Sequence, residues 1–465
     1  MKHVERTAKA VKANGRLGPL RVLSASGQLG YGLPAAALAE GFARRPHLVG
    51  ADMGSVDPGP GYLGGGTMGP SPEGAKADLA AVLRGARALD IPMLIGSAGT
   101  GGAKPQLDAT AAMLRELARE LGLHFRLATI AADLSQDTVL KAVRAGRVRP
   151  LGGMPELSEA EVLQANVIVG QMGTEAFQRA LAAGADVILA GRACDTAIFA
   201  ALPGLLGYPM GPLMHMAKIV ECASLCCVPG GRDAMLGTLE GEDFVLESMN
   251  PARAATPLSV AAHSLYEQDN PFEVFEPEGC LRVDAARYEA LDARRARVSG
   301  ATWTPAQQLT LKIEGTTRLG ERCLLLAATA DPRVIANLDS ILPAVERNVQ
   351  GMLPAGFGAY SLHVRRYGID GVIDWPTPPA APPREVFLLL EFVAPSMAAA
   401  KTVAAMTKQY LLHHGFPGRL STGGNLAFPL TPPEVEAGTA YRFSIYHVMD
   451  VEELAPLFPV SLEDL

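Results

Sequence analysis

Short apolar runs and longer amphipathic stretches alternate over roughly the first 200 residues. Residues 21–24, 47–50 and 91–95 are short apolar runs of the kind that form buried strands. Glycine-rich turns follow them, and residues 73–89 and 107–121 then place apolar side chains at helical spacing. Strands that alternate with helices predict an α/β fold, with a parallel sheet and helices on both faces.

The pattern changes after about residue 300. Residues 309–328 predict one long strand or a hairpin, and strands and helices then follow in the order of a two-layer α+β unit. The proline-rich tract at 376–383 predicts a stiff surface loop. We therefore expect two domains, an α/β domain over residues 1–300 and an α+β domain over residues 301–465.

The polar loops of the first domain fall at one edge of the expected sheet. Parallel strands all end at the same edge, and ligands bind there. The connections at the opposite edge, such as residues 44–46 and 182–184, carry little chemistry. This asymmetry predicts an active site built from the loops at residues 27–32, 52–66, 97–102, 171–175 and 192–196.

The loop at residues 50–67 is the most distinctive of these. It sets Asp52 and Asp57 in a frame of glycines and prolines directly after an expected strand. Such glycine content suits close backbone approach to a ligand, and carboxylates suit acid–base work or metal binding. The alternative is a surface turn system, because the same residue types dominate turns.

The other loops supply groups that suit an anionic substrate. Arg192 could hold a substrate carboxylate with Asp195 as acid or base, or the two could form a structural ion pair. Residues 96–102 could cradle an anion or form a tight turn. The catalytic candidates are Asp52, Asp57, Asp195 and Arg192. The substrate-binding candidates on these loops are Ser55, Gly59, Ser97, Gly99, Thr100, Gln171 and Thr174.

Metal binding stays open on the sequence. His215, Cys222 and Cys226 would share one face of a helix, although their spacing is no recognised zinc signature and ordinary packing explains it. Lys218 and Glu221 fit a helix ion pair. Residues 27–32 do not match the G-x-G-x-x-G fingerprint of dinucleotide-binding proteins, and the sequence contains no G-x-x-x-x-G-K motif of a P-loop.

Composition narrows the class of protein. The 465 residues are 48% hydrophobic and only 6% aromatic, with a net charge of −7, and no basic stripe suggests nucleic-acid binding. No apolar run approaches the ~20 residues of a membrane span, and residues 1–16 are no secretory signal. Six cysteines in so long a chain indicate no disulfide framework. We expect a cytoplasmic protein.

Several motifs together resemble the acyclic terpene utilisation (AtuA-like) family. They lie at residues 50–60, 96–100, 170–173, 184–192, 215–222, 250–251, 256–263 and 424–429. The resemblance implies a catabolic role in the breakdown of acyclic terpenoid or branched carboxylic acids, and it carries no established catalytic residue. Asn425, in the last of these motifs, joins the substrate-binding candidates.

These observations favour an enzyme that acts by proton transfer on a branched or unsaturated carboxylate or its acyl-CoA ester, as a hydratase, lyase or isomerase. One alternative is a hydrolase in which Asp52, Asp57 and His263 hold a divalent metal. Another is a non-catalytic subunit of a CoA-processing assembly. We expect a homo-oligomer, with the α+β domain and the apolar segment 446–460 as candidate interfaces.

Overall fold

The computed structural model describes residues 2–13, 16–266, 270–374, 377, 381–420 and 422–465. The chain forms two compact units, Met1–Thr317 with Phe443–Leu465, and Arg318–Arg442. The second unit is therefore shorter than the expected 301–465. Strands β17 (Leu309–Thr329) and β20 (Glu434–Val451) each begin in one unit and end in the other, and the C-terminal residues return to the first.

A ten-stranded sheet forms the centre of the first unit, in the order β14-β15-β11-β10-β3-β4-β5-β9-β6-β21. Its five middle strands are parallel, as the sequence predicts, and the outer strands are antiparallel. The parallel strands are β3 (Leu20–Ser24), β4 (Leu48–Asp52), β5 (Met93–Gly96), β9 (Val187–Ala190) and β6 (Arg126–Ile130). The antiparallel strands are β10 (Met235–Glu240), β11 (Asp243–Ser248), β14 (Arg287–Ala290), β15 (Arg295–Ser299) and β21 (Val460–Asp464).

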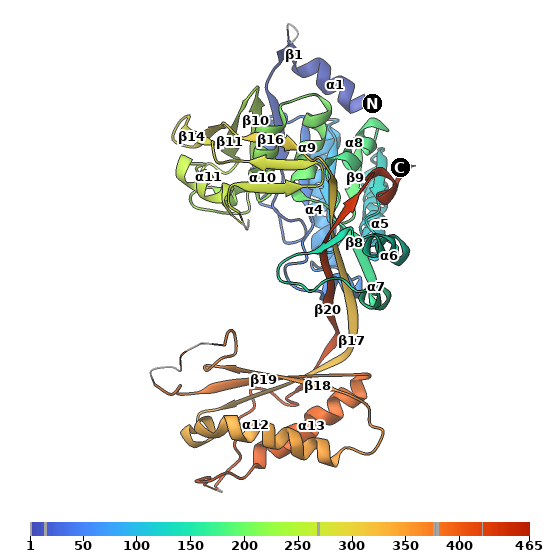
Figure 1. Cartoon of the computed structure of the whole chain (residues 1–465). Coiled ribbons are helices and arrows are strands. Elements are labelled where there is room, and N and C mark those ends of the chain that lie inside the picture. The colour runs from blue at the N-terminus through green and yellow to red at the C-terminus, as the bar shows by residue number, and fades with distance from the viewer. Residues whose placement is uncertain (1, 14–15, 267–269, 375–376, 378–380, 421) are drawn as a thin grey trace. The chain divides into compact units, whose positions relative to one another are not determined.

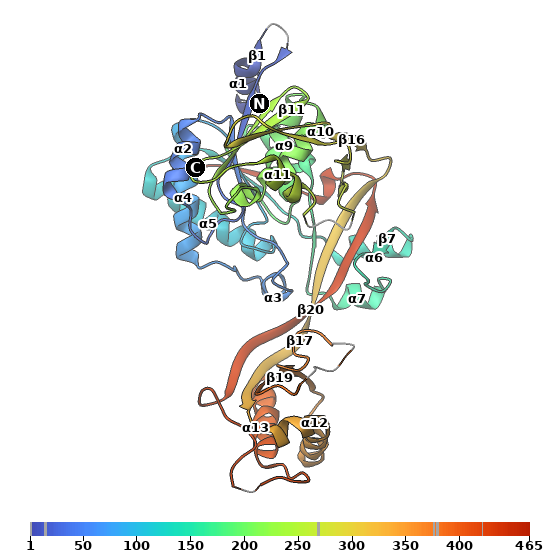
Figure 2. The ribbon, with the colours of Figure 1, turned by 90° about the vertical axis from the view of Figure 1, so that its left-hand side faces the viewer.

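Helices cover both faces of this sheet (Figure 2). Successive side chains of a strand point to opposite faces, so Val22 and Leu23 enter two different cores. One core contains α2 (Ala35–Ala43), α4 (Pro72–Ala88) and α5 (Lys104–Leu121). The other contains α8 (Thr174–Ala182), α9 (Asp195–Leu205) and α10 (Met210–Val220).

Strand β8 (Val167–Gly170) leaves the parallel series. It pairs antiparallel with residues Ile313–Thr316 of β17, although its sequence pattern suits the central sheet equally well. Three further strands form a small antiparallel sheet, β12 (Glu273–Glu276), β13 (Gly279–Arg282) and β16 (Thr302–Pro305). The remaining elements of this unit include α1 (Lys2–Val11), α3 (Gly61–Gly65), α6 (Gln136–Arg144), β7 (Val148–Pro150), α7 (Glu159–Gln164) and α11 (Pro257–Ser264).

The second unit is a two-layer α+β structure, as expected. Strands β18 (Ser361–Tyr367) and β19 (Val386–Ala394) pair beside β17, and α12 (Pro332–Met352) and α13 (Met397–His413) lie on one face of this sheet (Figure 1). Alternate residues of β19, such as Leu388 and Leu390, face the helices in one hydrophobic core. Half of the tract at 376–383 lies outside the described residues, so its stiffness stays a prediction.

Two features bear on partners. None of the described helices is long and apolar enough to cross a membrane. In the segment 446–460, the side chains of Met449, Val451, Leu454 and Phe458 are buried. They belong to a hydrophobic core of the first unit. These side chains therefore stabilise that unit itself.

Candidate active site

Three of the predicted loops meet at the carboxyl ends of β4, β5 and β9. The amide of Met53 donates to the carbonyl of Gly96 at 3.1 Å, and the amide of Ser97 donates to the carbonyl of Gly191 at 3.0 Å. The amide of Arg192 donates to the carbonyl of Gly102 at 3.1 Å. The loops after these strands therefore lie side by side, as the strand pattern predicts.

The backbone of these loops is tightly packed and strained. Gly102 has a φ of 69°, and a Cβ atom there would lie 2.2 Å from the amide nitrogen of Arg192. Ser97 and Thr100 have φ values of 45° and 112°, which L residues with side chains rarely adopt. Strain of this kind persists only where the surroundings enforce it, and it is common at binding and catalytic loops.

Asp52 is the buried acid of this edge. Its side chain closes β4 with 4% of the residue exposed, and Oδ2 accepts a hydrogen bond from the amide of Gly54 at 2.8 Å. Among the described residues no partner satisfies Oδ1. Burial raises the pKa of Asp52 well above its ordinary value, and the negative charge of Asp195 raises it further, although the Gly54 amide, the charge of Arg192 and the Ser97 hydroxyl act to lower it. Asp52 therefore has the properties of an acid–base group.

Arg192 is also buried, but its guanidinium has an internal partner. Nε and Nη2 donate to the two carboxylate oxygens of Glu314 at 2.8 and 3.3 Å, and Nη1 donates to Oγ of Ser97 at 3.3 Å. Lys312 also lies 3.1 Å from the Glu314 carboxylate. Although burial favours the neutral form of Glu314, these two cations lower its pKa. Glu314 thus occupies the bidentate position expected for a substrate carboxylate.

Lys218, Glu221 and Glu276 form a second group of buried ionisable side chains. Nζ of Lys218, in the last turn of α10, is 2.5 Å from Oε1 of Glu221, and both side chains are at most 10% exposed. Glu276, at the end of β12, is 8% exposed and accepts a hydrogen bond from the Thr196 hydroxyl at 2.6 Å. The sequence predicts an ion pair between Lys218 and Glu221, and the structure shows that pair in the interior.

Asp195 connects the two groups. It is the first residue of α9 and is half-buried. Its negative charge contributes to raising the pKa of Asp52, of Lys218 and of Glu221. Asp195 lies in the chain between Arg192, which bonds to Ser97, and Thr196, which bonds to Glu276, so its charge acts on both groups.

The second acid of the glycine-rich loop lies apart from this cluster. Asp57 is exposed, and its Oδ2 accepts a hydrogen bond from the Ser55 hydroxyl at 2.7 Å. Gly59 has a φ of 112° with open space around it. The structure thus brings Asp52 into the site and leaves Asp57, Ser55 and Gly59 in a turn beside it.

The remaining loop candidates contact neighbouring protein groups. Thr100 Oγ1 accepts from the amide of Gly69 at 2.9 Å, and Gly99 makes a left-handed turn with a φ of 63°. Gln171 donates to the carbonyl of Ala193 at 3.4 Å, beside the Arg192 loop. Thr174 donates to the carboxylate of Glu278 at 3.0 Å at the start of α8. These contacts hold the loops together.

Asn425 belongs to the second unit. Its amide nitrogen donates to the carbonyls of Leu411 and His414 at 3.0 and 2.9 Å, and its oxygen accepts from Arg419 at 2.8 Å. The side chain therefore fastens the end of α13 to the following loop.

The histidine and cysteine candidates do not form a metal-binding group. Helix α10 ends at Val220, so Cys222 and Cys226 lie beyond the helical face that would carry His215. His215 is fully buried, bonds to the Ser264 hydroxyl at 2.9 Å, and has a pKa lowered to about 3 by burial. None of the six cysteines, all of them among the described residues, forms a disulfide. His263 stacks on Tyr266, and burial and the charge of Lys218 lower its pKa to about 4.

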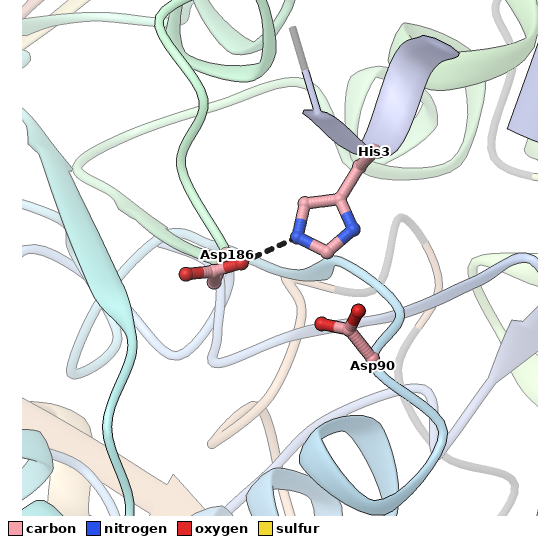
Figure 3. A group of neighbouring side chains, drawn as sticks. All are labelled: His3, Asp90 and Asp186. Carbon is pink, nitrogen blue, oxygen red and sulfur yellow. Dashed lines mark hydrogen bonds and ion pairs between the residues drawn. The ribbon is translucent and has the colours of Figure 1, made fainter. Parts of the chain in front are cut away.

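Among the described residues, the one group of three potential ligands with atoms within 4.8 Å of one another is His3, Asp90 and Asp186 (Figure 3). Asp90 and Asp186 precede β5 and β9, so this group lies at the amino ends of the parallel strands, opposite the edge that carries Asp52. Nε2 of His3 is 2.5 Å from Oδ1 of Asp186. Three cations, Lys2, Arg6 and Arg87, already form ion pairs with these two carboxylates. This charge balance fits an ion-pair network that fastens α1 better than a divalent metal site.

Glu314, Glu276, Lys218 and Glu221 were not predicted as site residues. Lys312 and Glu314 alternate with the apolar Leu311 and Ile313, which is the usual pattern of a strand with one solvated face. Glu276 directly precedes Pro277, in a segment for which the sequence pattern predicts no element. The sequence did contain one sign of these residues, because Lys312 and Glu314 are two apart on a strand and can form an ion pair on one face.

The fold and the site together define an α/β protein with a buried carboxylate, arginine and lysine cluster at the carboxyl edge of a central parallel sheet. The family model for the acyclic terpene utilisation family protein AtuA matches residues 77–204 and 240–435, which is more than half of the chain. The chain therefore belongs to this family. The matched ranges include Arg192, Asp195, Glu276 and Glu314, whereas Asp52, Lys218 and Glu221 lie outside them. No curated protein and no solved structure gives a match.

Proposed function

We propose that the protein is a catabolic enzyme that moves a proton on a branched or unsaturated carboxylate, or on its acyl-CoA ester, as a hydratase, lyase or isomerase. The family match implies a role in acyclic terpene catabolism, which supports this substrate class. The observation that carries the proposal is Asp52, a buried carboxyl group with an unpartnered oxygen and a raised pKa at the carboxyl end of a parallel strand.

A raised pKa suits a carboxylate that takes and returns protons near neutral pH. In the proposed reaction, Asp52 removes a proton from a carbon activated by the substrate carbonyl. The C–H electron pair forms a carbon–carbon double bond, and the carbonyl π electrons move to oxygen. Return of a proton at another carbon completes an isomerisation. In a hydration, Asp52 instead takes a proton from a water molecule whose oxygen bonds to the β-carbon of the unsaturated acyl group, the double-bond electrons form the enolate, and a proton added at the α-carbon completes the product.

Asp195 and Arg192 have different roles in this proposal. Asp195 is half-buried at the positive end of α9, so it lies between solvent and the buried groups. Arg192 is fixed by Glu314, so we assign it to fixing the loop beside Asp52 and to supplying positive charge there.

Solvent deuterium exchange tests the proposal without knowledge of the natural substrate. The probe is 3-methylbut-2-enoyl-CoA in D₂O, followed by proton NMR. The wild-type protein is expected to introduce deuterium, and Asp52→Asn to slow exchange by about 10²–10⁴-fold, the usual contribution of an acid–base group. Asp57→Asn, in the same loop but exposed, is the matched control. Equal exchange by wild type and Asp52→Asn would contradict the proposal.

A further inference from the structure

A substrate oxygen at this edge needs a cation other than Arg192. The guanidinium of Arg192 is bound to Glu314 through two nitrogens. If Arg192 turned to a substrate instead, the fully buried carboxylate of Glu314 would lose its main ion pair. Lys218 is the next buried cation, and the charge of Asp195 acts on it directly. An ammonium group has three donors, and the bond to Glu221 uses one of them.

Glu276 is the second buried acid near Lys218, and unlike Glu221 it has a neutral hydrogen-bond partner. Its partner is the neutral hydroxyl of Thr196, the residue next to Asp195, and among the described residues it forms no salt bridge. Lys218 acts on Glu276 through its charge, as it does on His263. Helices α9, α10 and α11 and strand β12 thus bring buried polar side chains into one neighbourhood.

The protons of this group can be assigned from its contacts. Burial opposes charge on both Lys218 and Glu221 and raises the pKa of Glu221 to about 8, but the 2.5 Å contact between Nζ and Oε1 favours the ion pair. Glu276 lacks a cation at such a distance, and burial raises its pKa to about 7 even though the hydrogen bonds with Thr196 and Cys194 lower it. Near pH 7 Glu276 therefore exchanges between its protonated and ionised forms, and Lys218 carries a positive charge.

We propose that Glu276 is the general acid of this site, that Lys218 binds the substrate oxygen on which negative charge develops, and that Glu221 is a positioning residue for Lys218. This inference rests on the proposed function and names the groups that complete it.

The step balances as one proton transfer in each direction. Asp52 takes a proton from carbon, and the electron pair of that C–H bond becomes the double bond of an enolate, whose oxygen accepts from the Lys218 ammonium. The enolate electrons then form a new C–H bond with the proton of Glu276, which is left as a carboxylate. Asp52 and Glu276 finish with their protonation states exchanged, and solvent restores them through the half-exposed Asp195.

Variants in the same exchange assay distinguish an effect of the Glu276 carboxyl group from an effect of changing strand β12. Glu276→Gln is expected to slow exchange into 3-methylbut-2-enoyl-CoA by about 10²-fold or more. Glu273→Gln is the matched control on the same strand, because Glu273 forms an outward ion pair with Arg282, and it should stay within about twofold of wild type. Lys218→Met should also lose exchange. Equal rates for Glu276→Gln and Glu273→Gln would overturn the assignment.

Thr196→Val gives a readout that a structural role would not produce. The wild-type rate is expected to fall as pH rises through about 7, where Glu276 loses its proton. Removing the Thr196 hydroxyl removes a hydrogen bond that lowers the pKa of Glu276, so the falling limb should move to higher pH. An unmoved pH profile would contradict Glu276 as the group that titrates.

Carbon-13 NMR of glutamate carboxyl groups tests the proton on Glu276 without any substrate. A resonance that titrates near pH 7 and is missing from Glu276→Gln is the expected result. Titration at the ordinary glutamate value of about 4.3 would overturn the general acid while leaving the proposed function standing. Absence of exchange by the wild type would count against the proposed function, whatever the NMR shows.

Discussion

The buried carboxyl group of Asp52 lowers the stability of the fold and suits acid–base chemistry. An ionised carboxylate with one unpartnered oxygen is expensive to bury, and Asp52 has 4% exposure with Oδ1 unsatisfied. Active sites commonly retain such groups at the expense of stability. The residue is thus better explained by the reaction than by the fold.

The same argument predicts opposite effects of Asp52→Asn on stability and activity. The amide keeps an acceptor for the amide of Gly54 and removes the buried charge. We expect the free energy of unfolding in urea at pH 7 to be unchanged or higher, while deuterium exchange is lost. A loss of more than about 1 kcal/mol would show that the ionised carboxylate supports the fold.

Asp186 is the contrasting case, an acid whose partners serve stability. Burial acts to raise its pKa, but the hydrogen bonds from His3 and the amide of Arg126, with the charge of Arg87, lower it well below its ordinary value. A lowered pKa in the folded state gives stability that is present above the unfolded value of about 3.9 and is lost as pH falls through the folded value.

Asp186→Asn should therefore lower the free energy of unfolding by about 1–3 kcal/mol at neutral pH. The difference from wild type should shrink below pH 4, because the wild-type carboxylate then loses its advantage. Urea unfolding at several pH values measures this, with Asp90→Asn as the control, since the side chain of Asp90 is 45% exposed. A difference that is constant with pH would contradict the ion-pair account.

Part of the site follows from the sequence at this scale. The position of Asp52, Ser97 and Arg192 at strand ends was predictable, because the apolar runs fix where each strand stops. The partners of the buried groups were not predictable, because Glu314 reaches Arg192 and Glu276 reaches Thr196 from strands distant along the chain. The bond between Arg192 and Glu314 depends on the pairing of β8 with β17, which local patterns do not encode.

At the scale of elements, glycine in the loop after β5 is needed for close approach to the loop after β9. Gly102→Ala combines a left-handed φ with a Cβ atom 2.2 Å from the Arg192 amide nitrogen. Gly122, at the end of α5, has a similar φ of 61° with nothing within 4 Å. Alanine variants at Gly102 and Gly122 therefore distinguish the free-energy cost of a left-handed backbone from that of a steric clash at Cβ.

Gly122→Ala should cost about 1–2 kcal/mol of unfolding free energy, the price of a left-handed alanine. Gly102→Ala should cost more than this and should also reduce exchange activity, because the Arg192 loop must shift. Thermal unfolding and the exchange assay measure both effects. Equal costs for the two variants would contradict the tight packing of these loops.

The elements themselves were largely predictable over the first 200 residues, where strand and helix periods are clear. The single strand β17 resolves the choice between a long strand and a hairpin, and helix α12 follows it in the predicted α+β order. The antiparallel strands between residues 235 and 305 were missed, since many are short with exposed residues. The extent of α10 was also overestimated, because Cys222 and Leu225 continue its apolar pattern beyond Val220.

At the scale of the molecule, the charged cluster lies within the first unit, including Lys312 and Glu314 of β17. Asn425 lies in the second unit and uses its amide group to hold α13. Asn425→Ala should therefore destabilise the second unit by about 1–3 kcal/mol, which hydrogen exchange of α13 amides would report. Deuterium exchange into the probe should be retained. A selective loss of that activity, with α13 protection unchanged, would instead support Asn425 as a substrate-binding residue.

The central claim is that acids at the carboxyl edge of this sheet hold protons at pH values where ordinary carboxyl groups do not. A carbon-13 NMR titration of the Asp52 carboxyl group, assigned by its absence from Asp52→Asn, tests this most directly. The account predicts a midpoint well above the ordinary aspartate value of about 3.9, because burial and Asp195 both favour the neutral form. A midpoint at or below that value would contradict it.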